Sequence, residues 1–315
     1  MGYTGLARWI NAPTTSIELI HNNITRNHQG QYKGKWTLSI RSYRSTLSSI
    51  PGYQVHAERS MCTLTMNDNV FVLLEDPAAP MHSEYHQKAA ELAQSQPGVQ
   101  LPPPAHYRHT FPTLGPPGAL EQLLAQLRAR WVSVRQAGGS GAAGGAAGGG
   151  QKGQGTGTGQ QLTVDGHVYS IGTDWLVRAG NVQLAGGAVK GMFLEAEYLP
   201  LPTMPTRANE RGETDLQFLL SNLLLSVLPN VPDARIVAVT IGDAQWEEIL
   251  WEEPEEGEEK DKSGKQGVDG DDDDDDIYAS EGDLPPVRKG DWIGVERDRR
   301  SAFLIIGALK QEGLL

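Results

Sequence analysis

The sequence contains a single cysteine, Cys62, among 315 residues, so no disulfide can form within the chain. Long apolar runs are also absent, since none approaches the roughly 20 residues that a helix needs to cross a bilayer. The segment from Met1 to Trp9 lacks the basic and apolar regions of a secretory signal. We therefore expect a soluble intracellular protein, in which Cys62 is an inert, half-buried thiol on a strand.

Motifs for catalysis or metal binding are scarce as well. No Gly-Lys-Ser/Thr follows the glycine-rich residues 138–159, so a phosphate-binding loop is not predicted. His82 and His86 have the i, i+4 spacing of half a zinc site, but a chain with one cysteine excludes a finger-type site. Residues 269–276 lack the glycine and the final glutamate of an EF-hand, which leaves diffuse binding of counter-ions. From these segments we predict no catalytic residue, no cofactor and no metal.

A basic surface is missing too. The formal net charge is −12, but residues 247–283 hold 18 of the 39 acidic residues and only three of the 27 basic ones. The remainder is close to neutral, and its arginines form no basic stripe and no aromatic stacking platform. We therefore predict no direct sequence-specific binding of nucleic acid, and we interpret the acidity as that of a solvated insertion.

Three low-complexity stretches interrupt the chain. Residues 77–118 are rich in proline, residues 138–159 contain 12 glycines, and residues 252–283 are acidic. The glycine-rich stretch buries little apolar surface against the conformational entropy that ordering would cost, and the proline-rich stretch is typical of an irregular excursion. We predict that they are insertions in a single domain over residues 1–315, with one short helix from His82 to Gln94 in the first of them.

Helical periodicity recurs between the insertions. Thr15 and Glu18 have the spacing of a capping box, which predicts a helix that begins there and ends by Gly30. Apolar residues at helical spacing predict four more helices, over residues 119–134, 216–228, 244–251 and 297–311.

Other segments have a period of two, which is typical of strands. These strands are predicted over residues 35–43, 53–59, 61–66, 69–74, 162–164, 167–169, 174–178, 182–185, 190–198 and 235–241. Asp165-Gly166 is typical of a two-residue hairpin turn, and Gly180-Asn181 also separates two of the strands. Sequential strands with helices grouped between them favour an α+β fold. Closure of about eight strands would remove exposed edges, so we predict an antiparallel β-barrel with flanking helices.

One pair of acidic residues permits a catalytic hypothesis. Glu195 and Glu197 alternate on a predicted strand, so both carboxylates share one face of the sheet. Facing into a barrel, they would hold a divalent metal for triphosphate hydrolysis. A one-sided sheet turns such a pair to solvent, which is the prediction we prefer. The predicted strands offer four arginines as further charges: Arg41, Arg44, Arg59 and Arg178.

The surroundings of this pair decide between the two hypotheses. Inward-facing glutamates amid at least four other charged residues would favour the hydrolase. An interior filled with Leu, Val and Phe would exclude it.

A series of sequence blocks is more specific than any single motif. The block from Trp36 to Ser45 reads WTLSIRSYRS, and other blocks follow in a fixed order along the chain. They comprise an opening Met1-Gly2-Tyr3-Thr4-Gly5, residues 71–75, a Leu-rich helix that ends at Trp131, residues 168–172, residues 191–198, a second Leu-rich helix and a last helix over residues 297–309. In content and order these blocks resemble the family of subunit 20 of the Mediator complex, especially its fungal members.

This resemblance implies a barrel with flanking helices in a non-catalytic head-module subunit of Mediator. Such a subunit is a protein-interaction scaffold in the nucleus that relays regulatory signals to RNA polymerase II. The implied partners are Mediator subunit 18, in a heterodimer, and subunit 8 with other head-module subunits. The resemblance implies no membrane, no catalytic residue and no cofactor, and it assigns no partner-binding residue. Transcription coactivation is thus the expected function, and triphosphate hydrolysis through Glu195 and Glu197 is the alternative.

Overall fold

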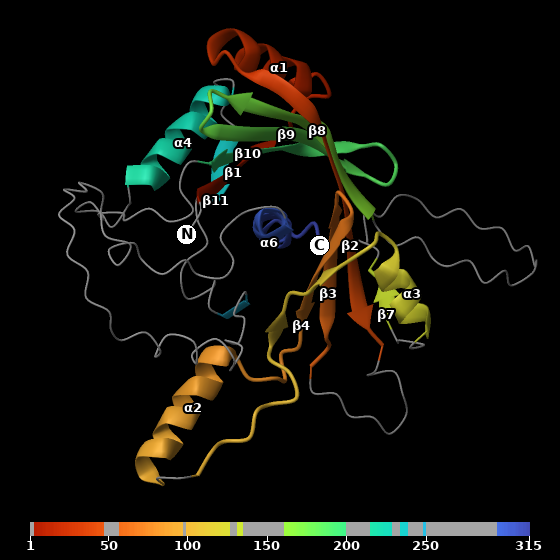
Figure 1. The fold of residues 1–315 in the computed structure, drawn as a ribbon. Helices are drawn as coiled ribbons and strands as arrows, with labels where there is room; N and C mark the ends of the chain where they lie inside the picture. The colour runs from red at the N-terminus through yellow and green to blue at the C-terminus, as the bar shows by residue number, and fades with distance from the viewer. Residues whose placement is uncertain are drawn as a thin grey trace, which may run out of the picture.

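The structure is a computed structural model that describes residues 3–46, 57–96, 99–126, 131–134, 161–199, 215–228, 234–238, 248–249 and 295–315. Helices and antiparallel strands combine in the α+β fold expected from the sequence (Figure 1). The predicted insertions over 138–159 and 252–283 lie outside the described residues, as does most of the strand over 53–59 and the helix over 244–251. The single-domain organisation stays a prediction. Among the described residues, no helix combines the length and apolarity needed to cross a membrane.

The described elements follow the sequence patterns closely in their centres. The helices are α1 (Ser16–Asn27), α2 (His82–Ser95), α3 (Ala119–Gln126), α4 (Asp215–Val227) and α6 (Val295–Gln311). The strands are β1 (Tyr3–Ile10), β2 (Gln31–Ser45), β3 (Ser60–Met66), β4 (Asn69–Glu75), β5 (His109–Thr110), β6 (Thr113–Leu114), β7 (Trp131–Ser133), β8 (Gln161–Ile171), β9 (Trp175–Leu184), β10 (Val189–Tyr198) and β11 (Ala234–Ala238). The helix predicted inside the proline-rich stretch is confirmed as α2.

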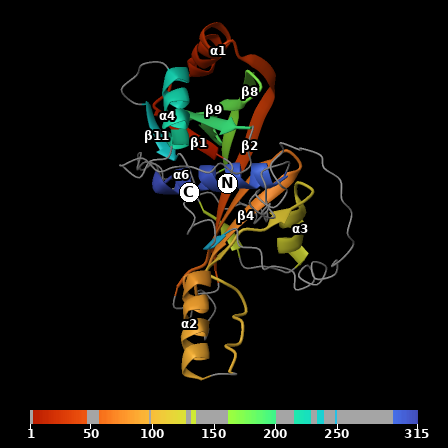
Figure 2. The same ribbon diagram turned by 60° about the vertical axis from the view of Figure 1, so that its left-hand side comes forward.

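The strands of the described chain join one antiparallel sheet, in the order β11-β1-β10-β9-β8-β2-β3-β4-β5. Off this path, β6 pairs with β4 and β7 pairs with β2. The sheet curls round α6, and within the described residues its end strands β11 and β5 do not pair with each other (Figures 1 and 2). The predicted antiparallel barrel with flanking helices is therefore confirmed, in the form of an open barrel.

Helices cover both faces of the curled sheet. On the outer face, α1 and α4 pack over β1, β8, β9 and β10, while α3 packs over β3 and β4. On the inner face, α6 lies in the concavity of the sheet, seen end-on in Figure 1 and lengthwise in Figure 2. In contrast, α2 projects away from the sheet and buries none of its residues (Figure 2).

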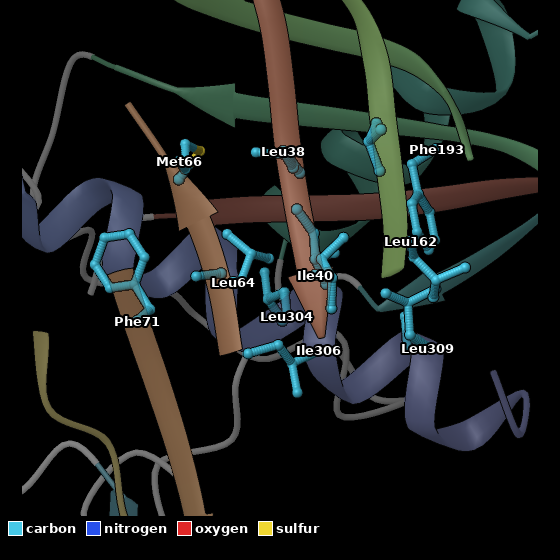
Figure 3. Packing of buried hydrophobic residues seen from close by; sticks show 14 of the residues in the cluster. Leu38, Ile40, Leu64, Met66, Phe71, Leu162, Phe193, Leu304, Ile306 and Leu309 are labelled. Carbon is cyan, nitrogen blue, oxygen red and sulfur yellow. The ribbon is translucent and has the colours of Figure 1, made fainter. Parts of the chain in front are cut away.

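The inner face and α6 share one apolar core. Strands β1, β2, β3, β4, β8, β9 and β10 supply the sheet side of this core, with Leu38, Ile40, Leu64, Met66, Phe71, Leu162 and Phe193 among its members (Figure 3). The large apolar side chains of α6 in the core are Leu304, Ile305, Ile306 and Leu309. Their burial stabilises the docked helix by on the order of 10 kcal/mol. This anchor begins at Ala302, whereas the first two turns of α6 are mostly polar.

Two glycines that predict turns lie inside strands instead. Gly166 is in the middle of β8, directly opposite Gly180 in the middle of β9. A Cβ on Gly166 would lie 1.9 Å from the carbonyl oxygen of Ala179, and one on Gly180 would lie 2.7 Å from Val164 Cγ1. The hairpin predicted at Asp165-Gly166 is therefore wrong, because glycine here permits a close approach between neighbours rather than a turn.

Replacing Gly166 with alanine should lower the free energy of unfolding by about 3 kcal/mol, because the new Cβ meets backbone atoms that cannot move aside. Gly34→Ala in β2 is the matched control. A Cβ at Gly34 meets no atom within 4 Å, so stability should stay within about 0.5 kcal/mol of the parent chain. Urea unfolding of both variants measures the difference. Equal stability of the two variants would contradict the close packing of β8 on β9.

Two further local predictions are wrong, and one strand is missing from the prediction. The helix predicted over 119–134 ends earlier, because Trp131–Ser133 form β7 and pair with β2. Strand β1 was not predicted, since its residues 4–9 are buried on both faces and show no alternation of polar and apolar side chains. The capping box is absent, because Thr15 makes no side-chain hydrogen bond at the start of α1.

Candidate functional site

Glu195 and Glu197 lie on β10 with their side chains on the inner face of the sheet, against α6. They are only 1% and 3% exposed. The neighbouring Leu194 and Ala196 belong to the apolar core of the outer face. The prediction that the glutamate pair faces solvent is therefore wrong. A one-sided sheet would leave that face open, but α6 covers it.

Arg178 of β9 joins the two glutamates. It lies opposite Glu195 in the pairing of β9 with β10, donates from Nη1 to Glu195 Oε1, and places Nη2 3.3 Å from Glu197 Oε2. Burial opposes the guanidinium charge, yet attraction to Glu195 and Glu197 outweighs it and raises the pKa of Arg178. Burial also raises the pKa of the Glu197 carboxyl, opposed by the Arg178 charge and assisted by that of Glu195. Arg178 is thus the counter-ion that lets two carboxylates share a buried place.

The first two turns of α6 supply the remaining contacts of the pair. Arg297 Nε lies 2.8 Å from Glu197 Oε1, and Ser301 Oγ donates a hydrogen bond to Glu195 Oε2. Each of the four carboxylate oxygens therefore has a neighbour, two of them from Arg178 and two from α6. Glu197 Oε2 is within ion-pair distance of Arg178 but accepts no hydrogen bond from the described residues.

Further charged residues line the same end of the inner face. Arg8 of β1 forms an ion pair with Glu312 and lies over the ring of Phe193, 5.8 Å from its centroid, and Arg300 of α6 is also buried. Arg178, Arg297 and Arg300 act on the carboxyl of Glu197, whereas the charge of Arg8 is balanced by Glu312. The other end of the interior, over β2 to β4, is apolar. The interior is thus divided, and its charged end meets the condition that favours the hydrolase.

The arginines expected from sequence are mostly elsewhere. Of the four, only Arg178 lies beside the glutamate pair. The other three form ion pairs outside this site: Arg41 with Glu121 at 2.7 Å, Arg44 with Glu58 at 3.3 Å, and Arg59 with Asp76 at 2.7 Å. The sequence reasoning missed Arg8, Arg297, Arg300 and Ser301. A signal was available for three of them, since a polar, arginine-rich start precedes the apolar part of α6.

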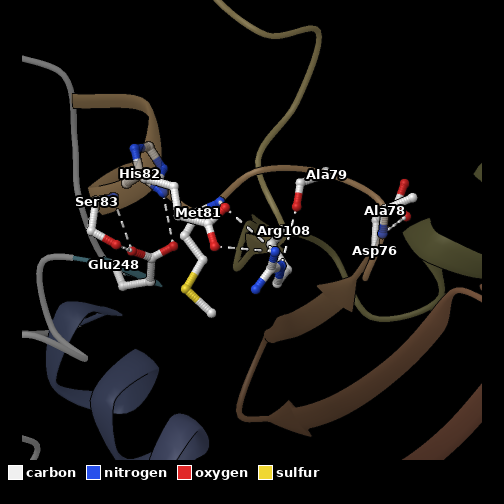
Figure 4. Close-up of polar contacts among 9 residues, drawn as sticks. Asp76, Ala78, Ala79, Met81, His82, Ser83, Arg108 and Glu248 are labelled. Carbon is white, nitrogen blue, oxygen red and sulfur yellow. Dashed lines mark hydrogen bonds and ion pairs between the residues drawn. The ribbon is translucent and has the colours of Figure 1, made fainter. Parts of the chain in front are cut away.

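The histidine pair lies in the first turns of α2, and Figure 4 shows His82 at the start of this helix. The backbone N–H groups of His82 and Ser83 donate to the carboxylate of Glu248, and the His82 ring stacks on Tyr107. Arg108 donates to the carbonyl oxygen of Ala79 beside this helix start (Figure 4). These contacts hold the first turn of α2, which is a structural role.

The glutamate pair offers two carboxylates to a divalent cation. Among the residues that the structure describes, no cluster of three or more His, Cys, Asp or Glu side chains could hold a metal. Mg²⁺, however, is commonly bound through one or two carboxylates and takes its other ligands from water and substrate phosphates. Glu197 Oε2, buried and without a hydrogen bond, has acceptor capacity for such an ion. The donor set therefore fits Mg²⁺ that arrives with a phosphate substrate.

No protein-family model matches the chain, and no curated protein matches it either. Solved structures that it resembles include a candidate adenylyl cyclase from Hippeastrum, described as having a dominant triphosphatase activity. That likeness has 10% identity and a TM-score of 0.33, over 78% of this chain and 94% of the other. A candidate adenylate cyclase from Vibrio parahaemolyticus has 8% identity and a TM-score of 0.32, over 71% and 88%. The triphosphatase of the Mimivirus capping enzyme has 9% identity and a TM-score of 0.24, over 72% and 90%.

These findings correct the function expected from sequence. The prediction of a non-catalytic Mediator head subunit, acting as a transcription coactivator, is wrong. The structures just described are named as triphosphatases and cyclases rather than as Mediator subunits. Their TM-scores are all below 0.5, so they assign no activity and no residue role to this chain.

Proposed function

We propose that the charged end of the barrel hydrolyses a triphosphate with the help of a divalent cation. The observation that supports this is the glutamate pair, which is buried on the inner face and surrounded by arginines. Burial of a carboxylate costs free energy, because the group loses its water of hydration. A catalytic or binding role is one reason for a protein to keep such a pair. Titratable groups with shifted pKa values, such as Glu197 and Arg178, occur often at functional sites.

The side chains divide into two roles. Glu195 and Glu197 would hold the cation, and Arg178 on the sheet would bind phosphate oxygens through its planar guanidinium group. Arg8 keeps Glu312 as its ion-pair partner. The cation, when bound, would neutralise charge on the transferred phosphoryl group. The other end of the interior, over β2 to β4, is filled by the apolar core and offers no charged group to a phosphate among the members of that core.

The purified full-length chain should release phosphate from inorganic tripolyphosphate or from a nucleoside triphosphate in the presence of Mg²⁺ or Mn²⁺. Chelation of the cation by EDTA should abolish the reaction. A colorimetric phosphate assay, run with a preparation free of contaminating phosphatase, measures the rate. Absence of phosphate release from both substrates, in this chain and in the Arg297→Gln variant, would show that the proposed function is wrong.

The other expectations from sequence are separate from this proposal. The resemblance to the Mediator subunit 20 family stays a prediction, as do the partners, subunits 18 and 8, and the nucleus as location. Co-purification with those subunits from a nuclear extract is the measurement that tests them.

A further inference from the structure

The first two turns of α6 occupy the positions that a cation would need. Arg297 and Ser301 contact one oxygen of Glu197 and one of Glu195. Arg178 contacts the other oxygen of each carboxylate. With α6 in this position, a divalent cation cannot reach the pair without displacing a neighbour. The side chain of Arg178 is 7% exposed and that of Arg297 is 29% exposed, so the start of α6 is the neighbour that is displaced more readily.

We propose that the start of α6, residues 295–301, is a built-in gate that competes with the divalent cation for Glu195 and Glu197. When the start of α6 is docked on the sheet, Arg297 serves as the counter-ion in place of the metal, and the site is closed. When residues 295–301 unwind, the two carboxylates become available to the cation, and the site is open. This inference rests on the proposed function, because it concerns access to the same carboxylates.

The structure of α6 separates a gate from an anchor. From Ala302 to Leu309 the helix is buried in the apolar core, and Lys310 pairs with Glu75 of β4. Release of the whole helix would expose this surface to water, which is far more costly than unwinding one end. Residues 295–301 contribute no member to this apolar core, and Val295 is 43% exposed. The contacts they make to the rest of the described chain include ion pairs, hydrogen bonds and the stacking of Arg299 on Phe111. Opening is therefore expected at the start of the helix alone.

The charge pattern of α6 supports the same division. Arg297, Arg299 and Arg300 lie within its first two turns, where they outnumber the acidic residues Glu296 and Asp298. The partial positive charge of a helix N-terminus repels cations, so arginines there destabilise an isolated helix. The carboxylate of Glu197 offsets this repulsion for Arg297. A cation bound at the glutamates would remove that compensation and add a repulsive charge, which favours unwinding of the same turns.

Competition for shared oxygens is a reciprocal coupling. A weakened gate must raise the affinity for the cation, and a bound cation must loosen the gate. Arg297→Gln should therefore raise the affinity for Mn²⁺ about tenfold. Arg41→Gln is the matched control, since Arg41 also pairs with a glutamate, Glu121, but lies outside both the gate and the glutamate pair. Its affinity for Mn²⁺ should equal that of the parent chain.

Electron paramagnetic resonance of free Mn²⁺, titrated into the full-length chains, measures these affinities. Glu197→Gln reports the binding that remains elsewhere, including diffuse binding by the acidic run Asp271 to Asp276. Hydrogen exchange read by mass spectrometry gives the second readout. Mn²⁺ should speed exchange over residues 296–301 of the parent chain and leave residues 302–309 unchanged.

Equal Mn²⁺ affinity in the parent chain and Arg297→Gln, or no binding beyond that of Glu197→Gln, would overturn the gate. Unchanged exchange over residues 296–301 on addition of Mn²⁺ would do the same. The proposed function fails separately. If Mn²⁺ competes with the gate but no triphosphate is hydrolysed, the gate is supported and the proposed hydrolysis is wrong. If triphosphate is hydrolysed while affinity and exchange stay the same in all variants, the gate alone is wrong.

Discussion

Replacing Arg178 with methionine should lower the free energy of unfolding by about 3–5 kcal/mol at pH 7. The substitution keeps most of the buried volume but leaves Glu195 and Glu197 without the charge that lies between them. The remaining neighbours, Arg297 and Ser301, come from the polar start of α6 and contact only one oxygen of each carboxylate. Urea unfolding followed by far-UV circular dichroism measures the loss.

The loss should also depend on pH, and its sign follows from the carboxylates. Burial already raises the pKa of Glu197, and removal of the Arg178 charge takes away the largest of the charge effects that oppose this rise. Between the ordinary and the raised pKa, the folded chain keeps a proton that the unfolded chain has released. Stability therefore falls as the pH rises through this range. The deficit of Arg178→Met should be smaller at pH 5 than at pH 8.

Arg41→Met is the matched control for this experiment. Arg41 also pairs with a glutamate, Glu121, but the two side chains are 38% and 49% exposed. An exposed pair contributes little, so its loss should cost about 0.5 kcal/mol, with little change between pH 5 and pH 8. A similar small cost for Arg178→Met, or equal deficits at both pH values, would mean that the glutamate pair does not depend on Arg178.

The sequence predicts those parts of the fold in which one face is apolar and the other polar. Trp36, Leu38 and Ile40 alternate with polar residues along β2, and the leucines of α4 recur at helical spacing, so both elements were predicted. The same holds for α6, whose apolar residues 302–309 end at a polar last turn. Patterns of this kind depend on a single buried face, which is a local property of the chain.

Where both faces are buried, the local pattern fails. Residues 4–9 of β1 are buried throughout. Strand β9 is predicted as two short strands, because Gly180-Asn181 is typical of a turn. In the structure Gly180 lies within the strand, where a Cβ would come within 4 Å of Val164 and Trp36. The orientation of the glutamate pair was missed for the same reason. Alternation gives the shared face of Glu195 and Glu197, but only the docking of α6, about 100 residues later in the chain, makes that face an interior.

Glu195→Gln and Glu197→Gln should each lower the rate of triphosphate hydrolysis about 100-fold or more, because the cation loses one of its two carboxylate ligands. Each single variant leaves the other glutamate as the partner of Arg178, so the chain should stay folded. Phosphate release and thermal unfolding, measured on the same preparations, separate loss of activity from loss of structure.

Glu75→Gln is the matched control for these two variants. Glu75 is also a glutamate that contacts α6, through Lys310, but it lies on β4, away from the glutamate pair. Its removal should weaken the anchor of α6 slightly and leave the rate of hydrolysis unchanged. A wild-type rate of hydrolysis in Glu197→Gln would place the reaction elsewhere in the chain. An equal loss of rate in Glu75→Gln would mean that docking of α6, rather than the carboxylates of the pair, sets the rate. Only a selective loss in Glu195→Gln and Glu197→Gln agrees with a cation held between β10 and the start of α6.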